Sequence, residues 1–152
     1  MSSRYQDLES AIVARLVANV PALTKVSAIA FPGATETATD SEAFVFFVGE
    51  KRTDSRPIAG SMHETMAVEF GVVIHKRHSG GPTGASRLGL AGAYEIQESV
   101  ISALLGFQPV ITSSPNVFPC LLEEVAIVEA GSDSVEIVMS WSTQWEIAEI
   151  IS

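Results

Sequence analysis

The first apolar pattern along the chain has the period of a helix. Between Tyr5 and Asn19, apolar residues recur at four-residue spacing: Leu8, Ile12, Leu16 and Val20. This spacing forms one apolar stripe on a helix, and acidic residues in the first turn suit the positive end of its dipole. Pro21 cannot continue the helix. We predict an amphipathic helix that ends before Pro21.

The next pattern has the period of strands. Thr24–Ala30 is a short candidate strand. In Phe44–Val48, both the odd and the even positions are apolar, as in a central strand covered on both sides. From Met66 to Ile74, apolar and other residues alternate with a period of two, which predicts a strand with one face on the core. The stretch Glu50–Gly60 is charged and contains a proline, so we expect an exposed connection there.

A second helix and a hairpin follow. Arg87–Leu105 carries an apolar stripe, and Gly106 is placed to end it in a left-handed conformation. The last third predicts a β-hairpin whose arms are Val117–Val128 and Val135–Ile147. Gly131, Ser132 and Asp133 would form its turn.

The order of these elements predicts an α+β fold. Helix, two or three strands, helix and two strands pack most simply as one mainly antiparallel β-sheet with both helices on its apolar face. Neither an internal repeat nor an interdomain linker is present in the sequence, so we expect residues 1–152 to form a single domain.

Composition narrows the possible partners. The formal net charge of -9 disfavours non-specific nucleic-acid binding, which needs Lys and Arg against phosphates. The single cysteine, Cys120, cannot form an intramolecular disulfide, which fits a reducing compartment, and we expect it to be a small half-buried strand residue. No apolar run approaches the roughly 20 residues of a membrane span.

The residues that could carry chemistry do not form a recognisable motif. Of His63, His75 and His78, the last two are close in sequence, but a strand would point them to opposite faces, so surface histidines are favoured over a metal site. The loop from Gly80 to Gly84 is glycine-rich but lacks the lysine of a phosphate-binding loop. A connection between strand and helix is the better interpretation.

The late glutamates and tryptophans also favour structural roles. Glu123 and Glu124 are adjacent, so a regular strand would separate them, and Glu146 and Glu149 are expected to be solvated charges. Trp141 and Trp145 share a strand face and favour a core position over a partner surface. We therefore assign no catalytic, cofactor-binding or metal-binding residues, and we expect neither enzyme activity nor a cofactor.

Several landmarks resemble the Gp37-like family of Mu-type phage and prophage proteins, which belongs with tail terminator and minor tail proteins. They are the opening helix, the Phe31-Pro32-Gly33 turn, the long strand leading through a glycine-rich loop to Gly92-Ala93-Tyr94, the helix end Leu104-Leu105-Gly106-Phe107-Gln108-Pro109, and the closing Val138-Met139-Ser140-Trp141. The resemblance covers nearly the whole chain, and the helix end is its most specific part.

The resemblance implies a structural subunit of a phage tail. Such a protein would form a ring, with six copies in place, at the end of the tail tube, where it would contact tube or head-completion proteins and let DNA pass as cargo. It would be made in the bacterial cytoplasm and end up in the virion tail, without a membrane. Long exposed loops, expected at Ala34–Glu42, Glu50–Gly60 and His78–Ser86, could serve as contact segments. The alternatives are a small ligand-binding or regulatory module, or a small enzyme with a scattered site.

Overall fold

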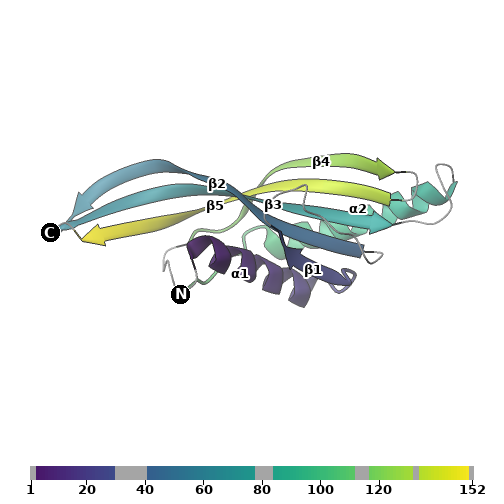
Figure 1. The fold of residues 1–152 in the computed structure, drawn as a ribbon, viewed down its shortest axis with the longest axis horizontal. Coiled ribbons are helices and arrows are strands. Elements are labelled where there is room, and N and C mark those ends of the chain that lie inside the picture. Colours follow the sequence, from purple (N-terminus) through teal and green to yellow (C-terminus); the bar gives the residue numbers. More distant parts are fainter. Residues whose placement is uncertain (1–2, 30–40, 78–83, 112–116, 132–133, 151–152) are drawn as a thin grey trace.

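The computed structural model describes residues 3–29, 41–77, 84–111, 117–131 and 134–150 (Figure 1). It contains two helices and five strands in these ranges: α1 Arg4–Asn19, β1 Lys25–Ala28, β2 Ser41–Ile58, β3 Ser61–Arg77, α2 Gly84–Leu104, β4 Leu121–Gly131 and β5 Ser134–Ile150. Both predicted helices and all the predicted strand segments are confirmed as elements. The Pro32-Gly33 turn, the loop between strand β3 and helix α2 before Gly84, and Ser132-Asp133 lie outside the described residues.

The strands form one sheet in the order β1-β2-β3-β5-β4. Strand β1 pairs with β2 in parallel, and the other three pairings are antiparallel. Both helices lie on the same side of this sheet, which we call the helix-covered face (Figure 1). The prediction of a mainly antiparallel α+β fold with both helices on one face is confirmed.

Helix α1 begins at a capping box. The Ser3 hydroxyl accepts a hydrogen bond from the Gln6 backbone N–H, and the Gln6 side chain accepts one from the Ser3 backbone N–H. These two bonds satisfy donors that a helix start leaves without partners. The predicted apolar stripe of α1 is buried against the sheet at Leu8, Ile12 and Leu16.

The main core lies between the helices and the sheet. Its largest buried side chains are Trp141 and Trp145, and the Trp141 ring stacks on Phe70 with the ring centroids 6.4 Å apart. The prediction that both tryptophans are core residues is confirmed. A smaller apolar cluster lies on the opposite face of the sheet, where Phe44, Phe46 and Val73 are buried.

The expectation of a connection at Glu50–Gly60 is wrong. Residues up to Ile58 continue strand β2 and pair with β3 as far as Ile58 opposite Ser61, so only Ala59 and Gly60 turn the chain. Charged residues are tolerated in this strand because its side chains at 51–57 are exposed to water. The polar residues from 51 to 57 indicate side chains in water, but they do not exclude a strand, which the prediction assumed.

The start of the last hairpin also differs from the prediction. Strand β4 begins at Leu121, whereas Val117 makes only an isolated bridge to Trp145. Pro119 lies between them and has no backbone N–H to donate to a ladder, which explains the late start. The predicted left-handed Gly106 is confirmed, with φ of 77°, and its N–H donates to the Cys120 carbonyl.

Gly71 gives a test of the cluster on the opposite face. A Cβ atom there would lie 2.2 Å from the Phe46 ring, which packs across the strand pair. We expect Gly71→Ala to lower the free energy of unfolding by about 1–3 kcal/mol through overpacking. Gly49→Ala is the matched control, because nothing lies within 4 Å of its Cβ position. Chemical denaturation measures both, and equal stability losses would contradict the packing.

Trp141 tests the main core. Its side chain is fully buried, so Trp141→Ala should lower the free energy of unfolding by about 3–5 kcal/mol. Val110→Ala, at a side chain that is 92% exposed, should change it by less than about 0.5 kcal/mol. A denaturant midpoint that stays the same in the Trp141 variant would remove Trp141 from the core.

Candidate interaction surface

Three strands extend beyond the rest of the fold. Strand β1 pairs only with residues 42–45 of β2, and the ladder between β4 and β5 reaches no further than Ser142. The outer parts of β2, β3 and β5 therefore continue as a three-stranded layer that projects past α1 (Figure 1). We call residues 49–58, 61–67 and 143–150 the arm.

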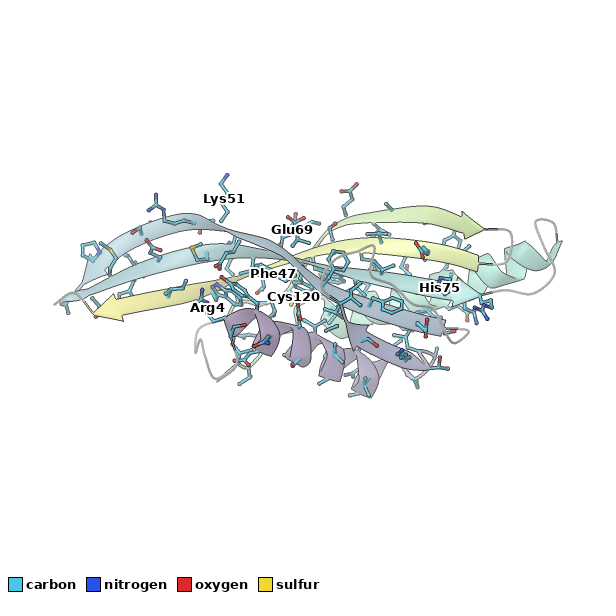
Figure 2. The ribbon with its side chains drawn as sticks, viewed as in Figure 1. Arg4, Phe47, Lys51, Glu69, His75 and Cys120 are labelled. Carbon is cyan, nitrogen blue, oxygen red and sulfur yellow. The ribbon has the colours of Figure 1, made fainter. Side chains whose placement is uncertain are left out.

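A partly buried carboxylate, that of Glu50, fixes the root of the arm to the helix. The Trp145 indole N–H donates to Glu50 Oε2 at 3.0 Å, and the Tyr5 hydroxyl donates to Glu50 Oε1. Arg4 forms an ion pair with the same carboxylate at 3.5 Å, and its guanidinium lies over the Trp145 ring. Figure 2 shows Arg4 on the helix side of the sheet. Glu50 thus joins α1, β2 and β5.

The contact with Glu50 raises the pKa of the Tyr5 phenol. Its hydrogen bond to Glu50 raises the pKa of Tyr5 above 10.0, with burial and the negative charge of Glu50 acting in the same direction and Arg4 opposing them. The folded state therefore favours the neutral phenol. This contribution to stability is complete below pH 10 and is lost as the pH rises through the folded-state pKa.

One edge of the arm, that of β2, is protected against adding another strand. The outer part of β2 carries Lys51, Arg52, Arg56 and Pro57, and its register shifts twice, between Phe47 and Gly49 and between Arg52 and Asp54. Charges, proline and bulges are the devices by which edge strands avoid edge-to-edge pairing. The β2 edge is therefore not expected to pair with a strand from another molecule, which favours contacts through the faces of the arm.

Beyond the first turn of α1, the helix-covered face of the arm carries both apolar and charged side chains. Met66 packs against the main core, whereas Met62, nearer the tip, is 36% exposed. Arg52 lies on this face opposite Met66 and forms an ion pair with Glu64 at 3.9 Å; the side chain of Arg52 is 64% exposed and that of Glu64 is 38% exposed. Such exposed, long ion pairs contribute little to stability, so Arg52 is accessible to a partner.

The opposite face of the sheet holds a groove at the root of the arm. Two adjoining hollows, of about 470 and 480 Å³, share Ala67, Glu123 and Ser142. Figure 2 shows Lys51 and Glu69, which line one of them, projecting away from the helices. Phe118 and Leu121, which line the other, are 42% and 57% exposed. We call the two hollows together the groove.

The two described histidines, His63 and His75, lie far apart on β3. His75 is buried, which corrects the expectation of a surface residue. It lies on the opposite face of the sheet, between Glu42 and Glu136 in the sheet register. Its Nδ1 lies 3.7 Å from a Glu136 carboxylate oxygen. His63 lies in the arm, and His78 lies outside the described residues. Within the described part of the chain, no three His, Cys, Asp or Glu residues are grouped to hold a metal.

Cys120 and the paired glutamates differ in detail from their predictions. Cys120 is fully buried and precedes β4, where the prediction was a half-buried strand residue, and burial raises the pKa of its thiol to about 12. The register of β4 shifts at Glu123, which breaks the alternation that was expected to separate Glu123 from Glu124. Glu123 accepts a hydrogen bond from the Ser142 hydroxyl and thereby lines the groove.

Comparison with known proteins decides the family. The family model of the phage tail terminator protein matches residues 1–122. The chain belongs to the phage tail terminator family. It is therefore a structural protein of phage-tail assembly, as the resemblance in the sequence implied.

A solved structure shares the fold of this tail terminator family member. A chain from the structure titled "Virion of native gene transfer agent (GTA) particle" aligns with a TM-score of 0.63 at 19% identity, over 96% of this chain and 100% of that one. No curated protein sequence matches. In the described residues, no helix is long and apolar enough to cross a membrane.

Sequence reasoning missed the two surfaces for different reasons. The sequence does not reveal the arm because the outer part of β2 is polar. Only its pairing with β3 shows that this segment is a strand. Glu50 was assigned to an exposed loop, although it sits at the boundary between an apolar run and a charged one. That boundary is the one sequence signal that could have identified it as the root of a protruding strand.

The Glu50 cluster can be tested by titration. In a Tyr94→Phe background, which leaves Tyr5 as the single tyrosine, we expect Glu50→Gln to move the pKa of Tyr5 back toward 10.0. We also expect the free energy of unfolding at neutral pH to fall by about 1–3 kcal/mol, because hydrogen bonds to a charged acceptor are lost. Ultraviolet titration of the phenol and denaturation measure the two effects. An unchanged Tyr5 titration would show that the carboxylate does not hold the phenol.

Proposed function

We propose that this chain is the tail terminator itself: a ring of identical subunits that closes the end of the tail tube. The observation that carries the proposal is the match to the tail terminator family over residues 1–122. The ring is expected to have the sixfold symmetry of a stacked-ring tube, with contacts to tube or head-completion proteins. The single domain would be made in the host cytoplasm and become part of the virion tail.

The charge of the chain supports a place beside a DNA channel. With a formal net charge of -9, the subunit repels phosphates, so DNA can pass without being held. A protein that bound DNA tightly would need a basic surface instead. DNA is therefore proposed as cargo that passes the ring, and the proposal includes no enzyme activity and no cofactor.

The exposed surfaces support repeated assembly. A closed ring needs one interface made of two different patches, one on each side of the subunit. The outer half of the arm and the groove at its root lie on opposite faces of the sheet. Each exposes apolar side chains, Met62 on the first and Phe118 and Leu121 on the second. The Gp37-like assignment within Mu-type phages remains a prediction from the sequence landmarks.

The proposal is tested on tails. A tagged copy of the chain, supplied to a host whose phage or prophage lacks the gene, should label one end of each tail in electron micrographs. Without the gene, we expect tails of irregular length that do not join heads, because nothing stops tube growth or prepares the end. Tails of normal length that join heads in the deletion would contradict the proposal.

A further inference from the structure

The arm and the groove use opposite faces of one sheet. The exposed strip of the arm, with Met62 and Arg52, is on the helix-covered face beyond the end of α1, whereas the groove, with Glu123 and Ser142, is on the opposite face. We propose that the arm of one copy lies with its helix-covered face in the groove of the next copy. This inference rests on the proposed function and specifies the contact that would build the ring.

The two surfaces match in apolar character. A single sheet layer with no second layer is an incomplete packing unit, since apolar strand faces are normally buried against another element. Met62 supplies a flexible apolar side chain near the tip, of the kind that adapts to irregular surfaces. Phe118 and Leu121 supply an exposed apolar wall for it in the groove. A second copy of the chain would cover both.

Charge supplies one specific contact between the two surfaces. On the docking face of the arm, Arg52 is largely exposed, and its ion pair with Glu64 at 3.9 Å contributes little to stability. The groove is lined by Glu50, Glu69 and Glu123 against one cation, Lys51. Of these, Glu50 is engaged with Arg4, Tyr5 and Trp145, which leaves Glu69 and Glu123 to face a partner. We expect Arg52 to leave its weak pair with Glu64 and to pair with Glu123 of the next copy.

The geometry favours head-to-tail assembly over a symmetric dimer, and such an assembly closes into the ring of the proposed function when the rotation between neighbours closes. In a twofold dimer, the same patch meets itself, so arm and groove would have to lie on one surface. Here they lie on opposite faces, so each copy presents an arm to one neighbour and a groove to the other. Docking by the face is also consistent with the protected edge of β2, whose charges, proline and bulges disfavour pairing with a strand from another copy.

Disulfide trapping tests the contact directly. In the double variant Met62→Cys with Ser142→Cys, the two thiols lie on opposite faces of the sheet and cannot join within one copy. Oxidation of tails that contain this variant should give a ladder of covalent multimers that ends at the ring. Each single variant is a matched control and should give no ladder. The native Cys120 is buried, so it should stay out of the reaction.

Charge reversal tests the same contact by rescue. Arg52→Glu and Glu123→Arg should each lower the number of copies per tail by at least about tenfold, as a like-charge contact costs more than the 1.4 kcal/mol that corresponds to tenfold. The double reversal should restore incorporation. Lys25→Glu and Glu98→Arg make the same charge changes at exposed positions outside both surfaces, and should assemble normally.

The outcomes separate this inference from the proposed function. If tails carry the protein at one end but the double cysteine variant gives no ladder, the function stands and the contact is wrong. A covalent dimer from Met62→Cys alone would mean that arms meet arms. A photo-crosslinker at position 62 that captures a different tail protein would assign the arm to that partner. Either result overturns the proposal. If the protein is absent from tails, the function fails, and the same trapping on concentrated purified protein decides the contact.

Discussion

The sheet of this protein is longer than the helices that cover it, and the rest of the structure depends on this mismatch. Strand β3 has 17 residues, which span roughly 56 Å, whereas the 16 residues of α1 span roughly 24 Å. The helices can therefore bury apolar side chains over only part of the sheet. Beyond them, strands β2, β3 and β5 carry polar side chains in place of a core, and the arm results.

At the boundary between core and arm, a charged side chain that is partly removed from water needs hydrogen-bond partners within the fold. Glu50 meets this need because each of its carboxylate oxygens has a donor from the fold: Tyr5 for one and Trp145 for the other, with Arg4 supplying the opposite charge. A carboxylate left without such partners would cost several kcal/mol to bury. The cluster therefore ends the hydrophobic core and, at the same time, fixes the direction in which the arm leaves the subunit.

The sequence predicts those parts of the fold in which polarity and periodicity agree. The apolar stripe of α1 and the alternation around Trp141 are strong sequence signals, because one face of each element is apolar and the other is polar. The signal fails from Lys51 to Pro57, where both faces of the strand are in water and long-range pairing with β3 alone maintains the strand. The groove could not be predicted for a related reason: it combines β2, β3, β4 and β5 with the segment before β4, and the bulge at Glu123 moves that side chain in a way that no local pattern encodes.

The central claim is that the arm, the part of the sheet that no helix covers, is the surface through which neighbouring subunits assemble. High-resolution electron cryomicroscopy of the tail end tests it most directly. The account predicts a closed ring in which the arm of each subunit crosses the opposite face of its neighbour, with Met62 near Leu121 and Arg52 near Glu123. A ring in which the arms project into solvent, or in which subunits meet through α1 and α2, would contradict it.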